Sequence, residues 1–206
     1  IVPLTEMPAM ENPTEHWIRS ANNRTAPEDY PYPLSGTWAT GHRAQRIREM
    51  LQEKQRLSVK DFVRMQMDTT SIRAIETVPI LEQLLSHIPD ERMQQVLSSL
   101  KQWDRRMEQD SAGAAIFETF FAKWSQCVAA EQFTEQEVPD IAGAISGLSA
   151  ELLSKDQYAW FANQDREEKI IATLLDAIED LSNRLGNEIS NWTWGDIHKI
   201  ELRHIL

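Results

Sequence analysis

The stretch that decides the fold is DSAGAAIFETFFAKW, residues 110–124. Its first two residues, Asp110 and Ser111, carry side-chain oxygens that can accept hydrogen bonds from the free amides of a helix start. Small residues follow, which let another backbone approach closely, and large apolar residues then recur at helical spacing. We therefore predict a buried helix here. Its small residues are Ala112, Gly113, Ala114 and Ala115, and its large ones are Ile116, Phe117, Phe120, Phe121 and Trp124.

Helical signals precede this stretch. Ser58 and Asp61 have the spacing of a reciprocal capping box, which predicts a helix start at Ser58. Apolar residues continue at helical spacing as far as Pro79, where the missing backbone donor should kink or restart the helix. Asp90 follows a second proline and should cap the next helix, which runs towards Trp103.

Helical signals also follow it. Residues 134–137 form a further capping pattern, and the strongest amphipathic repeat of the chain spans residues 167–185. Gly186 comes directly after that repeat and is suited to the positive φ of a helix stop. The predicted fold class is therefore mainly α.

The amino-terminal part differs in composition. Residues 1–42 contain six of the nine prolines, each of which removes a backbone donor. We expect an extended, loop-like segment, in which His16 to Ala21 is the best candidate for a strand. Because no later segment reads as a set of partners, this strand should pair with a sheet supplied from elsewhere.

Composition limits the classes of function. The 206 residues carry a net charge of −11, which disfavours binding to a phosphate backbone. The one dense basic stretch, residues 42–56, is interrupted by apolar residues at helical spacing and is predicted to be a solvated helix face. No run of about 18 apolar residues exists, so we expect no membrane span. The single cysteine, Cys127, lies in an apolar run and is predicted to be a buried, inert thiol.

Common catalytic signatures are missing from the sequence. His198 and His204 are six positions apart, a spacing that does not place both rings on one helix face. Neighbouring carboxylates, at 135/137, 167/168 and 179/180, are better explained by helix solvation and capping. We therefore predict no metal site and no cofactor.

The adjacent amides Asn22 and Asn23 allow two interpretations. Asparagine favours turns, because its side chain bonds to nearby backbone and it tolerates left-handed conformations. Alternatively, a rigidly held carboxamide can donate to a developing oxyanion, which is worth about 2.7–4 kcal/mol of barrier in acyl transfer. The residue types alone leave both interpretations open and favour the turn.

Four segments resemble the beta chain of the penicillin acylase (penicillin amidase) family, in the same order along the chain. They are NNRTAPEDYPYPLSGTWATGHRAQRI (22–47), VRMQMDTTSIRA (63–74), WDRRMEQDSAGAAIFETFFAKW (103–124) and WTWGDIHKIELRHIL (192–206). The resemblance covers nearly the whole chain. It implies a helical segment of an N-terminal-nucleophile (Ntn) hydrolase with a four-layer αββα sandwich, and short strand pieces near the two ends.

The resemblance also implies a chemistry. Members of this family cleave linear amides through an acyl-enzyme on a serine, which their precursor exposes by cleaving itself. The α-amine of that serine has a pKa of about 7.7–8.0 and can serve as the base. The motif places the oxyanion-hole asparagine at Asn22 and an active-site arginine at Arg43. Asn23 remains the alternative donor if the strand is shifted by one residue.

Two positions depart from the family pattern. The chain begins at Ile1, so we expect the nucleophilic serine on polypeptide upstream, and no hydrolysis by these residues alone. Pro33 stands where some relatives have a calcium-binding aspartate, so this position should contribute no calcium ligand. The family resemblance also suggests export to the periplasm or medium.

The resemblance predicts a division of the chain. Residues 1–42 should belong to the catalytic core, residues 43–191 should form the helical region, and residues 192–206 should return to the core, with the aromatic residues of this last segment packing structurally. The expected partners are the rest of the precursor, including an alpha chain, and a small amide substrate. Apolar surface meant for those missing neighbours should favour a dimer. The rival hypothesis is a helical scaffold without catalysis, in which Asn22 and Asn23 form only a turn.

Overall fold

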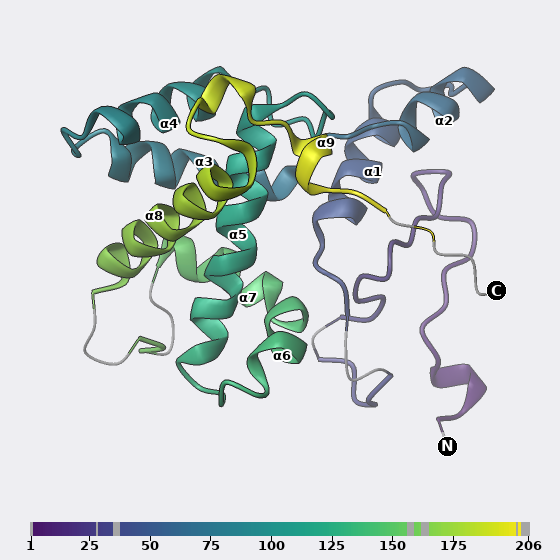
Figure 1. Cartoon of the computed structure of the whole chain (residues 1–206). Helices are drawn as coiled ribbons and strands as arrows, with labels where there is room; N and C mark the ends of the chain where they lie inside the picture. Colours follow the sequence, from purple (N-terminus) through teal and green to yellow (C-terminus); the bar gives the residue numbers. More distant parts are fainter. Residues whose placement is uncertain are drawn as a thin grey trace. The chain divides into compact units, whose positions relative to one another are not determined.

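The computed structural model describes residues 2–27, 29–34, 38–155, 159–161, 165–200 and 202 (Figure 1). The chain divides into two compact units, unit 1 (Ile1–Asp68) and unit 2 (Thr69–Leu206). Within the described ranges the regular elements are all helices, and strand-type pairing is limited to one isolated bridge between Thr70 and Arg106. The predicted fold class, mainly α, is therefore confirmed.

Unit 1 has little regular structure. It contains a short 3-10 helix, η1 (Leu4–Glu6), and two α-helices, α1 (His42–Gln52) and α2 (Val59–Gln66). The candidate strand at residues 16–21 forms no ladder in this chain, because a strand needs a neighbouring edge and the described residues contain no sheet. Helix α2 leaves several apolar side chains exposed, namely Val59, Phe62, Val63 and the adjacent Met67.

Unit 2 is built around one central helix, α5 (Ala112–Ala130), which the opening stretch predicted. Figure 1 shows α5 passing through the middle of this unit, and it contacts α4 and each of the later helices. Helix α3 packs against α4 and α7. The other elements of unit 2 are α3 (Ile72–Leu85), α4 (Glu91–Gln102), α6 (Val138–Ala144), α7 (Ser146–Ser154), α8 (Arg166–Leu185), η2 (Ile189–Asn191) and α9 (Trp194–Ile197).

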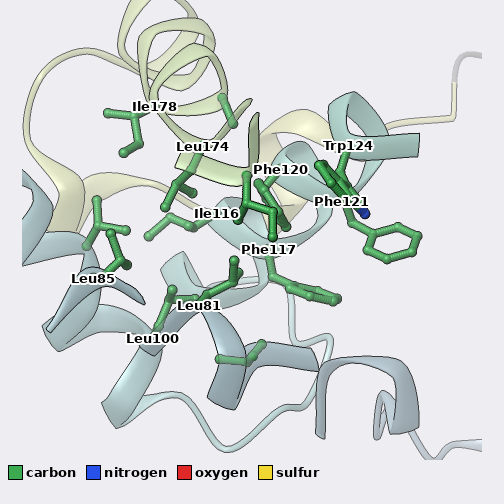
Figure 2. Close-up of a cluster of buried hydrophobic side chains, with 14 of the residues drawn as sticks. Leu81, Leu85, Leu100, Ile116, Phe117, Phe120, Phe121, Trp124, Leu174 and Ile178 are labelled. Carbon is green, nitrogen blue, oxygen red and sulfur yellow. The ribbon is translucent and has the colours of Figure 1, made fainter. Parts of the chain in front are cut away.

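The core of unit 2 surrounds α5. Figure 2 shows its aromatic and aliphatic side chains meeting leucines and isoleucines from α3, α4 and α8. Phe117, Phe120 and Trp124 are completely buried. The small residues at the start of α5 permit close packing, since a Cβ placed at Gly113 would overlap Trp103, with ring atom Cδ2 at 2.9 Å. Sequence pattern and tertiary packing therefore agree here.

Most predicted helix starts are confirmed. Ser58 and Asp61 form the capping box of α2, the Asp90 carboxylate accepts from Met93 N at 2.9 Å, and the Ser111 hydroxyl accepts from Ala114 N at 3.1 Å. Gly186 ends α8 with a φ of 88°. These signals are local, so the sequence alone reveals them.

The predicted continuous helix from Ser58 to Pro79 is wrong. Helix α2 ends at Gln66 and α3 begins at Ile72, after the cap Ser71. The backbone between them is bonded to a distant loop, with Met107 N donating to Thr69 O at 2.9 Å and Ser71 N donating to Arg105 O at 2.9 Å. These tertiary bonds replace the helical ones.

Pro79 does not restart α3, which contains it in its interior. A proline inside a helix costs one hydrogen bond and adds a steric clash. The neighbouring Val78 and Leu81 are buried almost completely in the core. Their packing offsets that cost, so tertiary structure overrides the local propensity.

Candidate functional site

The candidate site begins at a strained turn in unit 1. Asn22 has a φ of 61°, in the left-handed region that asparagine tolerates better than most residues. The preceding Ala21 is buried, with 7% of its surface exposed. Ala39 N donates to Asn22 O at 2.8 Å, so the two ends of the intervening loop lie side by side. The turn is therefore fixed from a residue far along the sequence.

Arg43 completes the turn from the first turn of α1. Its Nη2 atom donates to Asn22 Oδ1 at 2.9 Å and to Ala21 O at 3.0 Å. Helix α1 is itself anchored through Ala44 and Met50, which are buried. The structure thus brings the two predicted site residues, Asn22 and Arg43, into direct contact across 21 positions of sequence.

This contact determines which way the Asn22 carboxamide faces. A guanidinium can only donate hydrogen bonds, so the atom it contacts must be the carbonyl oxygen of the amide. The NH2 group of Asn22 consequently points away from Arg43. Within the described ranges, this NH2 group makes no hydrogen bond, and the Asn22 side chain is exposed. The site therefore presents an oriented and available donor.

Asn23 behaves differently from its neighbour. Its Oδ1 accepts from Ala21 N at 3.1 Å, and its Nδ2 donates to Arg24 O at 2.8 Å. Both ends of this carboxamide are occupied by local backbone, as the turn interpretation predicts for such a residue. The sequence left undecided which of the two amides is the donor, and the structure shows that they have different hydrogen-bond partners.

The loop after the turn is stiffened by its tyrosines. The Tyr30 hydroxyl donates to Glu6 O at 2.8 Å, and the Tyr32 hydroxyl donates to the Glu6 carboxylate. That second bond, together with slight burial, raises the pKa of Tyr32 above its usual range. A hollow of about 250 Å³ lies along this loop, with Arg24 and Trp38 among its lining residues.

Metal-binding clusters and membrane-spanning helices are both absent from the residues that the structure describes. In the ranges that the structure describes, no three His, Cys, Asp or Glu side chains gather closely enough to hold a metal ion. Pro33 lies in the tyrosine loop and offers no side-chain ligand. None of the described helices combines the length and the apolar character needed to cross a bilayer.

The surroundings of the cysteine and of the aromatic residues near the carboxyl end indicate roles in packing. Cys127 is half-buried and burial raises the pKa of its thiol, which disfavours the nucleophilic thiolate. Trp192 is completely buried, and its Nε1 donates to Gly186 O at 2.8 Å. Trp194 stacks on His198 with ring centroids 4.6 Å apart. These aromatic residues pack structurally, as predicted, whereas His204 lies outside the described residues.

One of the paired carboxylates, Glu137, is bonded to Thr134 in the turn before α6. Glu137 Oε2 accepts from Thr134 N at 3.0 Å and from Thr134 Oγ1 at 2.8 Å. These bonds lower the pKa of Glu137 and stabilise its charged form. The pattern at residues 134–137 therefore closes the turn before α6, whereas the N-cap of α6, Glu137, makes no side-chain cap bond to the helix.

Unit 1 thus holds a carboxamide oriented by an arginine. This is the chemistry of a donor site for an oxyanion or another acceptor. The family model for penicillin amidase matches residues 1–206. The chain belongs to the penicillin amidase family.

Individual relatives of this chain are acylases. The chain is 22% identical to an acyl-homoserine lactone acylase, QuiP of Pseudomonas aeruginosa, over 94% of this chain and 26% of the relative. It is 26% identical to the penicillin acylase 2 proenzyme of Pseudomonas sp. strain SE83, over 100% of this chain and 27% of the relative. The chain therefore spans about a quarter of the length of these curated relatives.

A solved structure supports the fold. The chain matches a thermostable penicillin G acylase from Alcaligenes faecalis with a TM-score of 0.71 and 18% identity, over 93% of this chain and 40% of that chain. The fold of this chain is accordingly that of a mainly helical part of a penicillin acylase. Assignment of residues 1–42 and 192–206 to the catalytic core stays a prediction.

Proposed function

We propose that this chain forms part of the catalytic subunit of an amidohydrolase that cleaves linear N-acyl amides. The supporting observation is the Arg43–Asn22 contact, which turns the amide NH2 of Asn22 away from Arg43 and leaves it without a hydrogen bond to any residue that the structure describes. The attacking serine and its α-amine would come from polypeptide outside these 206 residues. Acyl-homoserine lactones and penicillins, which appear in the names of the relatives, are the first substrates to test.

Asn22 would stabilise the oxyanion of the tetrahedral intermediate. When serine attacks the amide carbonyl, negative charge develops on the carbonyl oxygen. A donor already held in place stabilises that charge without reorganising during the reaction. The left-handed backbone, the Ala39 bond and the Arg43 bond hold Asn22 in this way.

Arg43 would act by orientation and electrostatics. Arginine side chains serve as fixed cations and hydrogen-bond donors, not as proton carriers. Donation to Asn22 Oδ1 polarises the carboxamide and makes its NH2 a stronger donor. Donation to Ala21 O at the same time ties the turn to α1.

Two substitutions test these roles in the complete enzyme that carries this chain. Asn22→Ala should lower kcat about 10²–10³-fold with little change in KM, because the lost bond forms chiefly in the transition state. Arg43→Ala should lower kcat by a smaller factor, since the amide remains but is less well aimed. Initial rates on a penicillin and on an N-acyl-homoserine lactone provide the measurement.

Asn183→Ala is the matched control, because it removes an exposed carboxamide from α8 in the other unit. It should leave kcat and KM unchanged. Full kcat in Asn22→Ala would remove the oxyanion assignment. A complete protein that hydrolyses no N-acyl amide would instead favour the helical scaffold.

A further inference from the structure

We propose that Asn23 is a positioning residue that holds the backbone of Asn22 in its left-handed conformation and so aims the Asn22 NH2 group. This inference rests on the proposed role of Asn22 as oxyanion donor. It assigns the second amide of the pair a function that acts through its neighbour. Within the described residues, the Asn23 side chain forms hydrogen bonds to backbone atoms of Ala21 and Arg24.

The side chain of Asn23 forms a hydrogen-bonded bridge across Asn22. Asn23 Oδ1 accepts from Ala21 N, before Asn22, at 3.1 Å. Asn23 Nδ2 donates to Arg24 O, after Asn22, at 2.8 Å. A single planar carboxamide therefore links the backbone on both sides of Asn22 and limits rotation of the peptide groups between them.

Such a bridge is needed because the Asn22 conformation is unfavourable by itself. A residue other than glycine at a φ of 61° persists only where its surroundings fix it. Two further bonds act on the same segment, from Ala39 N to Asn22 O and from Arg43 Nη2 to Ala21 O. Those bonds fix where the turn lies, whereas the Asn23 bridge fixes its internal shape.

The residue type matches this task. The bridge requires one acceptor and one donor on the same short, flat group, which asparagine provides. Aspartate can keep the bond from Ala21 N but would place an oxygen against Arg24 O. Alanine removes both bonds. Release of the bridge would let Asn22 relax towards negative φ, which turns its Cα–Cβ bond and moves the NH2 group away from its target.

The experiment is a double-mutant cycle in the complete enzyme. Asn23→Ala should lower kcat about 10- to 100-fold with KM nearly unchanged, because small misplacement of a catalytic donor costs rate more than binding. Asn23→Asp should give an intermediate kcat, since one of the two bonds remains. Asn22→Ala with Asn23→Ala should be no slower than Asn22→Ala alone, because Asn23 acts only through Asn22.

The outcomes separate this inference from the proposed function. If Asn22→Ala is impaired while Asn23→Ala has the kcat of the parent enzyme, the positioning role is wrong and the oxyanion role stands. Fully additive losses in the double variant would also overturn it, because they indicate a general structural effect. If Asn22→Ala keeps full kcat, the proposed function itself is wrong. NMR of the Asn22 side-chain NH2 provides a readout independent of activity, and its signals should shift in Asn23→Ala but not in the control Asn183→Ala.

Discussion

Unit 2 buries large apolar side chains from several helices, whereas the described part of unit 1 buries few. The buried side chains of unit 1 are Ala21, Ala44, Met50, Leu51 and Asp61. Unit 2 is stabilised by the burial of apolar surface, which contributes about 1.5–3 kcal/mol of folding free energy for each large side chain. The Asn22 turn is held by hydrogen bonds, which contribute about 0.5–1.5 kcal/mol each.

This difference predicts that substitutions in the two units have different effects. Binding and catalytic groups commonly lie on irregular segments that a rigid scaffold positions. The candidate donor, Asn22, lies on such a segment, and its alignment depends on a few directional bonds. Substitutions in the core of unit 2 should therefore change stability, and substitutions around the turn should change rate.

The largest expected effect on stability comes from Trp124. Its ring is completely buried, stacks on Phe120 and donates from Nε1 to Ser149 O at 2.7 Å. Trp124→Ala should lower the free energy of unfolding by about 3–5 kcal/mol, measured by urea denaturation followed by circular dichroism. Trp124→Phe keeps an aromatic ring and should cost less, which keeps the test valid if the alanine variant does not fold.

Trp38 is the matched comparison in unit 1, because 37% of its surface is exposed. Trp38→Ala should cost clearly less stability than Trp124→Ala. Equal costs would contradict the contrast between the two units.

A smaller effect is expected at Gly113. A Cβ there would overlap the side chain of Trp103, so Gly113→Ala should lower the free energy of unfolding by about 1–3 kcal/mol through overpacking. The control is Gly143→Ala in α6, where the added Cβ would meet nothing within 4 Å beyond its chain neighbours and the backbone of its own helix. That change should instead stabilise by about 0.5–1 kcal/mol. The same sign for both variants in denaturation curves would contradict the packing argument.

The loss of a helix cap should have a moderate effect. Ser111→Ala removes the acceptor for Ala114 N at the start of α5 and should cost about 1 kcal/mol. Ser111→Asp restores an acceptor and should recover most of that stability. Thermal denaturation of the three proteins measures the difference, and no recovery by aspartate would argue against a capping role.

The smallest effect, in unit 1, should depend on pH. The Asp61 side chain is bonded to Lys54 and to Ser58 N and Oγ, which lowers the pKa of its carboxyl below the usual range. Because the folded-state pKa is lower than the unfolded one, the stabilisation is present above about pH 4 and is lost as pH falls below it. Asp61→Asn should therefore destabilise α2 at pH 7, with a difference that shrinks in acid.

NMR signals of α2 residues during thermal unfolding at several pH values measure this effect. Val59→Ala, at a highly exposed position of the same helix, serves as a control whose effect should not vary with pH. A difference between Asp61→Asn and the parent that stays constant from pH 7 into acid would contradict the assignment.

Much of the helical fold could be predicted because its signals are local. The caps Ser58, Asp90 and Ser111 act within one turn, and the apolar repeat of α5 reflects a single helix face. The break between α2 and α3 was missed because its bonds connect Thr69 and Ser71 to residues more than thirty positions away. A pattern in a short stretch of sequence cannot predict such a contact.

The amino-acid sequence by itself indicated most of the helical segments and where they begin, and its resemblance to a known family singled out Asn22 and Arg43 as site residues. Only the tertiary structure decided that these two side chains touch, and that Asn23 is bonded to backbone while the Asn22 NH2 has no partner among the described residues. The physical reason is the distance along the sequence over which each interaction acts. Helix propensity and capping act between neighbours, whereas the direction of a carboxamide depends on a guanidinium that folding brings from 21 residues away.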